Sequence, residues 1–143
     1  MVSQGSLARS VTSVAAKATI EVIEEDRLMD NAETVGRYYR DGLESLKEKH
    51  ELIGDVRGMG LLVAIELVKN RATKEPAPEA TNQFMEQCRK GGLLVGKGGL
   101  FGNVIRTSPP LNISKGDVDE AIRIMDQAFT AMSPQMAGAG ARG

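Results

Sequence analysis

One arginine stands out among the residues whose chemistry could bind a ligand. Arg106 lies in the apolar, β-branched run of residues 104–108, which two prolines then end. An arginine held on a strand presents a rigid planar fork of N–H donors, and such a fork most often pairs with a carboxylate or a phosphate. Two interpretations carry equal weight: Arg106 binds a small anionic substrate, or it pairs with a local acid such as Asp55 or Glu66.

Arg57 and the glycine-rich segment 96–102 suggest ligand chemistry less strongly. Arg57 lies beside Gly58 and Gly60, a spacing typical of a tight bend or bulge, so we predict that its side chain supports a loop. Segment 96–102 does not match the phosphate-loop pattern, and no helix follows it to supply amide donors. The segment predicts a flexible hairpin connection that could close over a ligand beside Arg106.

The remaining reactive side chains do not form a catalytic group. His50 has no second ligand at metal-binding spacing, and it is predicted to be a surface histidine at a helix end. Cys88 lies on an apolar helical stripe and is predicted to pack as a small hydrophobic residue. Glu24, Glu25 and Asp26 are consecutive, which predicts a solvated face. No set of residues combines a nucleophile, a base and an orienting group.

Composition predicts one soluble globular domain. The chain has 143 residues, of which 41% are hydrophobic and 26% charged, with a formal net charge of -1. Because no basic stripe is present and aromatics make up only 3%, nucleic-acid binding is not expected. A single cysteine excludes an internal disulfide, and no apolar run is long enough for a membrane span. These features, with no secretory signal, predict a cytoplasmic location.

Hydrophobic periodicity predicts elements in the order α-α-β-β-α-β-β-α. This order indicates an α+β fold: a small, mostly antiparallel sheet with helices packed on one face, preceded by a long N-terminal helical segment. The predicted helices span residues 11–25, 28–49, 79–91 and 117–132. Two strands are predicted within 53–68, the second over 61–68, and two more over 92–95 and 104–108. Residues 1–10 are expected to be a tag or frayed leader, 11–132 the domain, and 133–143 a disordered tail.

Four segments in order carry a resemblance to a known family. Residues 19–28, 53–61, 92–96 and 105–111 resemble class III aminotransferases, pyridoxal-phosphate enzymes of fold type I, and are nearest to the alanine–glyoxylate or 4-aminobutyrate type. The resemblance runs from about residue 11 to 132 and covers only the family's C-terminal small domain. It implies that Arg106 holds the substrate α-carboxylate. It also implies that Arg57, Gly58 and Gly60 form a supporting turn near the site.

The resemblance also implies which parts of such an enzyme lie elsewhere. The family's large domain carries the lysine that forms the Schiff base with pyridoxal phosphate, and Lys17, Lys97 and Lys115 do not match that lysine. Ala8-Arg9-Ser10 stands where the family usually has Gly-Asn-Pro, which suggests a junction. We therefore expect an aminotransferase domain that moves an amino group between an amino acid and a 2-oxo acid in the full-length enzyme. This chain alone is expected to bind no cofactor and to be inactive.

Two alternatives to an enzyme fragment remain open. The chain could be a stand-alone binding module for amino or keto acids, with Arg106 as its anion contact. It could also be an oligomerisation module that exposes an apolar face, either around residues 61–68 or along the stripe of Val14 and Ala18. The second alternative predicts self-association into a homo-oligomer, including exchange of the N-terminal helix.

Overall fold

A computed structural model describes residues 4–139, with side chains described within 11–132. The fold is α+β, and the predicted order of elements is confirmed, with one two-residue strand, β3, added. The elements are α1 (Gln4–Glu25), α2 (Leu28–Lys49), β1 (Ile53–Met59), β2 (Leu62–Asn70), β3 (Glu75–Pro76), α3 (Pro78–Lys90), β4 (Gly96–Gly98), β5 (Val104–Thr107) and α4 (Lys115–Ala139).

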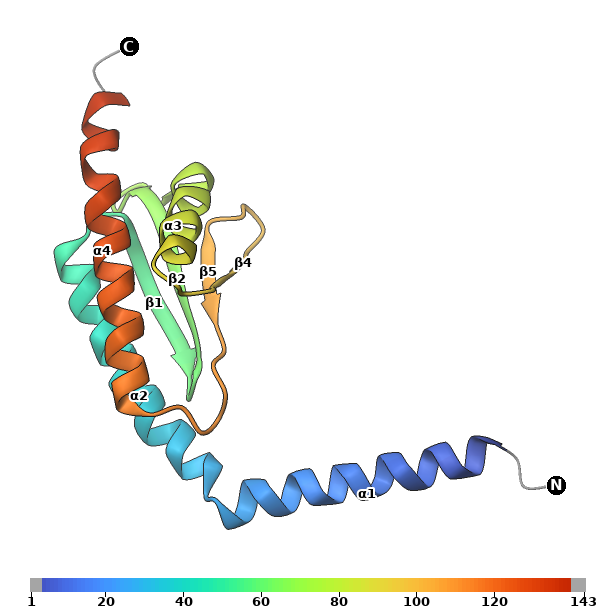
Figure 1. The fold of residues 1–143 in the computed structure, drawn as a ribbon. Helices are drawn as coiled ribbons and strands as arrows, with labels where there is room; N and C mark the ends of the chain where they lie inside the picture. The colour runs from blue at the N-terminus through green and yellow to red at the C-terminus, as the bar shows by residue number, and fades with distance from the viewer. Residues whose placement is uncertain (1–3, 140–143) are drawn as a thin grey trace.

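The sheet is antiparallel, and its strands lie in the order β1-β2-β5-β4, with β3 pairing the end of β2. In β2, Val63, Ile65 and Leu67 are at most 1% exposed, whereas Leu62 is 55% exposed. This alternation follows from the two-residue period of a strand, which sends successive side chains to opposite faces. The buried residues of β2 join those of α2, α3 and α4 in one core, so the helices cover one face (Figure 1). The opposite face stays open.

Helix α2 packs closely against the turn that joins β1 to β2. Its buried positions recur every three or four residues, as expected for an amphipathic helix. A Cβ at Gly36 would lie 2.2 Å from the carbonyl oxygen of Gly60. Gly60 itself has a φ of 54°, a left-handed conformation that suits glycine in a tight turn. The tight bend predicted around residues 58–60 is therefore confirmed, and two glycines allow helix and turn to meet.

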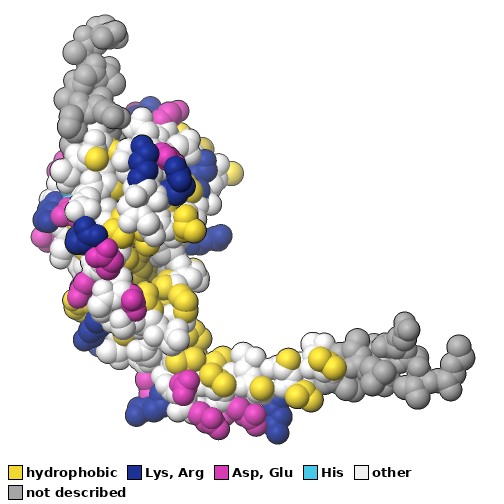
Figure 2. Space-filling view, viewed as in Figure 1, with side chains coloured by type: hydrophobic (Ala, Val, Ile, Leu, Met, Phe, Trp, Pro, Cys, Tyr) yellow, Lys and Arg dark blue, Asp and Glu magenta, His cyan; other side chains and the backbone are white. Residues whose placement is uncertain are grey.

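Helix α1 projects away from the body of the domain (Figure 1). The separation of the two helices predicted over 11–25 and 28–49 is confirmed, because Arg27 adopts a left-handed φ of 52° between α1 and α2. Val11 and Val14 on α1 are both 70% exposed. Figure 2 shows hydrophobic side chains along the side of α1 that turns toward the body, with acidic and basic ones on the other side. The apolar stripe of α1 is thus uncovered in this chain.

The other predicted exposed face is wrong. Leu61, Val63, Ile65, Leu67 and Val68 are all at most 4% exposed. Leu61, Val63, Ile65 and Leu67 belong to the core between the sheet and the helices, and Val68 is buried outside that cluster. Leu62 is the large apolar side chain of β2 that is exposed. Strands buried on one face place only alternate residues outside, which is why a continuous apolar run did not produce an exposed apolar surface.

The strand predicted at 92–95 is also misplaced. Residues 92–95 are irregular, and the strand is β4, within the segment predicted as a flexible loop. Gly96, Lys97 and Gly98 pair with Arg106, Ile105 and Val104. Backbone pairing with β5 therefore outweighs the low strand propensity of glycine. Leu93 and Val95 instead pack against the core.

The first and last helices are longer than predicted. Helix α1 begins at Gln4, and α4 begins at Lys115, two residues before its predicted start. Ser114, directly before α4, exchanges hydrogen bonds with Asp117 in the manner of a capping box. Helix α4 continues to Ala139. Residues 1–3 and 140–143, which belong to the predicted leader and tail, lie outside the described residues. The predicted domain boundaries stay predictions.

Candidate functional site

Arg106 lies on β5, on the face of the sheet that the helices leave open. Its register partners are Ala64 on β2 and Gly96 on β4, so only a methyl group and a hydrogen flank it across the strands. The side chain is exposed, and it has no hydrogen bond or ion pair within the described part of the chain. A guanidinium with five donors therefore stands unpaired between two small neighbours.

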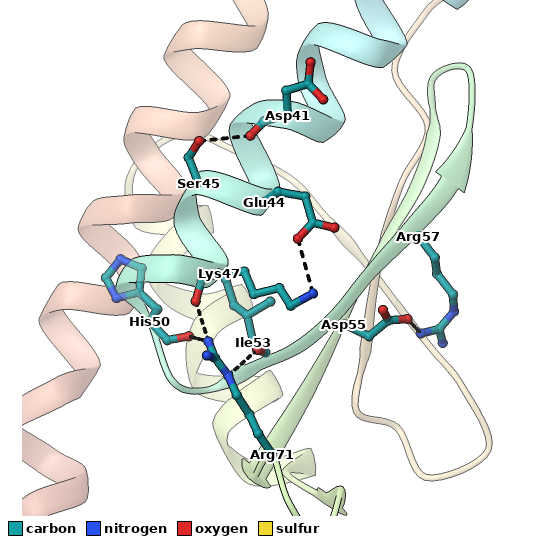
Figure 3. A network of polar contacts seen from close by, with 9 residues as sticks. All are labelled: Asp41, Glu44, Ser45, Lys47, His50, Ile53, Asp55, Arg57 and Arg71. Carbon is teal, nitrogen blue, oxygen red and sulfur yellow. Dashed lines mark hydrogen bonds and ion pairs between the residues drawn. The ribbon is translucent and has the colours of Figure 1, made fainter.

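The two acids considered as partners of Arg106 belong to Arg57 instead. Arg57 Nη1 lies 2.6 Å from Asp55 Oδ2 and 2.7 Å from Glu66 Oε2. Figure 3 shows Arg57 and Asp55 side by side on β1. Asp55, and then Glu66, raise the pKa of Arg57 by accepting its hydrogen bonds. The interpretation in which Arg106 pairs with a local acid is therefore wrong for this structure.

Arg106 also borders a cavity of about 610 Å³ beside β5, which we term the β5 cavity. Its walls are mainly apolar and come from the segment after α3, from β5 and from α4. The lining residues are Tyr39, Leu93, Leu94, Val95, Gly96, Arg106, Thr107, Ser108, Pro109, Ile113, Asp117, Val118 and Ala121. An apolar hollow with a few polar groups is a common form of small-molecule site.

A second cavity, of about 630 Å³, lies at the β1–β2 turn and is termed the turn cavity. It is bordered by Met29 from α2, by Met59 and Gly60 from the turn, and by Ser108 and Pro109. Ser108 and Pro109 line both cavities, so the segment that follows Arg106 separates them. Of the residues predicted as the supporting turn, Gly60 borders the turn cavity, whereas Arg57 and Gly58 lie on β1 and are not among its lining residues.

Comparison with known proteins identifies the family. The model of the class-III aminotransferases matches residues 7–129. This chain belongs to the class-III aminotransferases. Over 123 residues it is 47% identical to alanine–glyoxylate aminotransferase 2 homolog 2, mitochondrial, of Arabidopsis thaliana, covering 86% of this chain and 26% of that protein. It is 42% identical over 122 residues to an alanine/serine racemase of Pyrococcus horikoshii, covering 85% of this chain and 25% of that one.

The solved structures agree with the family. An amine transaminase from an uncultivated Pseudomonas species, in its pyridoxal-phosphate-bound form, superposes with a TM-score of 0.75 at 30% identity, over 82% of this chain and 26% of that one. The chain thus spans about a quarter of the length of these relatives. The name of the Arabidopsis relative places that protein in mitochondria, so the cytoplasmic location stays a prediction. No helix in the described part of this chain is long and apolar enough to cross a membrane.

Class-III aminotransferases depend on pyridoxal phosphate, and Lys17, Lys97 and Lys115 do not fit its attachment. Neither cavity has a lysine in its lining. Lys17 pairs with Glu21 on the exposed α1, and Lys97 donates to Asn82. Lys115 lies over the ring of Tyr38, 5.1 Å from its centroid. A lysine that forms a Schiff base needs a desolvated pocket that favours its neutral form, and these surroundings do not provide one.

The two side chains predicted to be inert differ in outcome. Cys88 is fully buried, and burial raises the pKa of its thiol to about 12, which confirms a packing role. The prediction that His50 is a surface histidine is wrong. Its side chain is only 12% exposed and lies 2.6 Å from Asp126, because α4 packs over the end of α2. No group of residues with metal-ligand chemistry occurs among the residues that the structure describes.

Sequence reasoning missed two residues that shape the site. Tyr39 is one of the buried residues of α2, at 3% exposed, and it also lines the β5 cavity. Burial raises the pKa of Tyr39, and a hydrogen bond with Thr107 opposes this rise. Gly36 went unnoticed, although a glycine inside a strongly periodic helix is a signal of close backbone approach.

Proposed function

We propose that this chain supplies the substrate-carboxylate arginine of an enzyme that moves an amino group between an amino acid and a 2-oxo acid. The residue is Arg106. The observation that carries the proposal is the unpaired guanidinium on the open face of the sheet, flanked only by Ala64 and Gly96. The neighbouring acids cannot compete for it in this structure because Arg57 engages both.

Arg106 has the right chemistry for this role. A guanidinium can donate two parallel hydrogen bonds to a carboxylate, which fixes the plane of the carboxylate as well as its position. A substrate held this way has its remaining substituents oriented before any bond changes, and such orientation lowers the barrier of a later step. A lysine at this position would offer a point charge without the fork.

The relatives indicate which acids to test first. One relative is named for alanine and glyoxylate and another for alanine and serine, and all three compounds carry a carboxylate next to the reacting carbon. Binding of that carboxylate is the feature that a transaminase and a racemase of such acids share. We therefore infer that Arg106 binds this carboxylate, and we propose alanine with glyoxylate as the substrate pair.

The reactive groups are proposed to lie on polypeptide outside these 143 residues. The chain corresponds to about a quarter of its relatives, and no described lysine borders either cavity. In this proposal pyridoxal phosphate is held elsewhere and supplies the bond-breaking chemistry, while this chain binds and orients. The 143-residue chain by itself is then inert as a transaminase.

The carboxylate role can be tested on the chain itself. Pyruvate would be titrated into ¹⁵N-labelled protein and compared with pyruvamide, which has the same shape but no charge. We expect the Arg106 side-chain signal to shift with pyruvate only, and Arg106→Met to abolish the response. Equal responses to both compounds, or a response that persists in R106M, would refute the role.

The proposed activity is to be tested on the whole product of the gene that encodes this chain. We expect it to convert alanine and glyoxylate to pyruvate and glycine. Arg106→Met should raise KM for alanine by about 10–100-fold, because a hydrogen-bonded charge pair is lost. An unchanged KM in the variant would contradict the proposal, as would the absence of an upstream domain in the gene product.

A second role, association with another copy, is favoured by one observation. The apolar stripe of α1 is exposed between residues 11 and 22, with Val11 and Val14 both 70% exposed. Exposed contiguous apolar surface of this kind commonly marks an interface. This role is compatible with the first.

A further inference from the structure

Two arginines occupy diagonal positions to Glu66 in the strand register, one on each neighbouring strand. On β1 its register partner is Asp55, and on β5 its partner is Val104. Arg57 lies two residues beyond Asp55, and Arg106 lies two residues beyond Val104. Both arginines are therefore diagonal neighbours of Glu66 on the open face. Diagonal neighbours on one face are about 7–8 Å apart, which long side chains can span.

In the structure Glu66 pairs with Arg57 and not with Arg106. Its Oε2 accepts from Arg57 at 2.7 Å, and its Oε1 lies 3.5 Å from Asn103 Nδ2. Asn103 is only 2% exposed and donates to the carbonyl of Leu67, so it is a fixed neighbour. Arg57 is itself held by Asp55 at 2.6 Å. Arg57 on β1 thus holds the carboxylate of Glu66, and Arg106 on β5 makes no ion pair with it.

We propose that Arg57 is a positioning residue that keeps Glu66 from pairing with Arg106. Without Arg57, the glutamate carboxylate is within diagonal reach of the Arg106 guanidinium and imitates the substrate's own carboxylate. A carboxylate tethered on the neighbouring strand acts at an effective concentration in the millimolar range, so it competes with a dissolved acid. The proposal rests on the proposed function in one respect, because it takes Arg106 as the group that binds the substrate carboxylate.

The capture itself can be tested without any substrate. The Nε–H signal of the Arg106 side chain would be recorded by NMR in the 143-residue chain and in variants with Arg57→Met, with and without Glu66→Gln. R57M should shift this signal, because the Glu66 carboxylate then accepts hydrogen bonds from the Arg106 guanidinium. Adding E66Q should return the signal to its wild-type position. If R57M leaves the Arg106 signal unchanged, Glu66 does not turn to Arg106 and the proposal is wrong.

The consequence for binding is tested with pyruvate as the probe. R57M should weaken pyruvate binding by roughly two- to fivefold, the range expected for a competing, partly exposed ion pair. Adding Glu66→Gln should restore it. Adding Asp55→Asn is the matched control, because it restores the same net charge but leaves Glu66 free to reach Arg106. We expect no restoration in R57M/D55N.

Each other result contradicts the proposal. Equal rescue by E66Q and D55N means that R57M acts through net charge alone, and rescue by neither means that Arg57 only supports the fold. The two proposals can also be separated. If pyruvate binding does not depend on Arg106 at all, the proposed function fails, whereas the NMR signal of the Arg106 side chain in R57M and R57M/E66Q still decides whether Arg57 restrains Glu66.

Discussion

His50 Nε2 lies 2.6 Å from Asp126 Oδ1, and this pair joins the end of α2 to α4. The other carboxylate oxygen of Asp126 accepts from Lys49 at 3.0 Å. The imidazole also stacks on Phe129, with 5.0 Å between ring centroids. One carboxylate therefore ties two consecutive residues at the end of α2 to the helix that covers them.

We expect Asp126 to make the stability of the chain depend on acid pH. The hydrogen bonds from His50, and then from Lys49, hold the pKa of Asp126 below its usual value. A depressed folded-state pKa gives stability that is complete above the unfolded pKa of about 3.9 and is lost as pH falls through the folded value. The free energy of unfolding, measured with urea, should fall between pH 5 and pH 2 and fall less in Asp126→Asn.

Asp41→Asn is the control for this experiment, because Asp41 is exposed on the same helix, α2, that carries His50. The D41N chain should keep the wild-type dependence on pH. If D126N and wild type lose stability in parallel over this range, the pair with His50 does not contribute as described.

Gly36→Ala should destabilise the chain although alanine is the better helix former. In an open helix this change would stabilise by about 1 kcal/mol. At Gly36 the new Cβ would lie 2.2 Å from the backbone oxygen of Gly60, and neither backbone can move without opening the packing of α2 on the β1–β2 turn. We expect a loss of about 1–3 kcal/mol, measured by urea unfolding.

Gly42→Ala on the same helix is the matched comparison. There the new Cβ would meet the side chain of Ile122 at 3.2 Å, and a side chain can rotate away where a backbone cannot. G42A should therefore cost much less than G36A. Equal losses in the two variants would show that the approach of Gly36 to Gly60 has no special role.

Arg71 fastens the C-terminal end of α2 to the beginning of β1. Its guanidinium donates to the carbonyls of Lys47, His50 and Ile53, and Figure 3 shows these contacts converging. The carbonyls at the end of a helix lack partners within the helix, so a cation with several donors suits them. Arg71→Met should lower the free energy of unfolding by about 1–3 kcal/mol.

Arg71→Lys separates the effect of charge from that of the fork. A lysine keeps the positive charge but cannot reach three carbonyls in one plane, so R71K should recover only a small part of the loss. If R71K is as stable as wild type, charge near the helix end accounts for the whole effect. Thermal unfolding followed by circular dichroism suffices for this comparison.

Local sequence signals predicted the elements that depend on local interactions. The bounds of α2 follow from its apolar stripe, and α4 begins within two residues of its predicted start, beside the hydrogen-bonded pair of Ser114 and Asp117. The bend at 58–60 follows from Gly58 and Gly60, because both have positive φ angles that glycine adopts readily. β4 was missed because its pairing is decided by β5, which supplies hydrogen-bond partners to a segment with poor strand propensity of its own.

The candidate site shows the same division. The sequence indicates Arg106 as a candidate because it is a charged residue in a β-branched run. The sequence does not indicate whether its side chain is paired with an acid. Which arginine takes Glu66 depends on the register of three strands, and one residue of slippage would reverse the faces. His50 was misjudged for a similar reason, because Asp126 lies 76 residues away along the chain.

The exposed stripe of α1 predicts self-association of the 143-residue chain. Val11, Val14, Ala18 and Val22 recur on one side of the helix, and the three valines are 49–70% exposed. Two copies can cover these stripes by packing α1 against α1 or by exchanging the helices. Sedimentation velocity should show a dimer or larger species. Val14→Glu should shift it to monomer, whereas Ala16→Glu, on another side of the same helix, should not. A wild-type monomer at high concentration, or equal effects of the two substitutions, would exclude α1 as the interface.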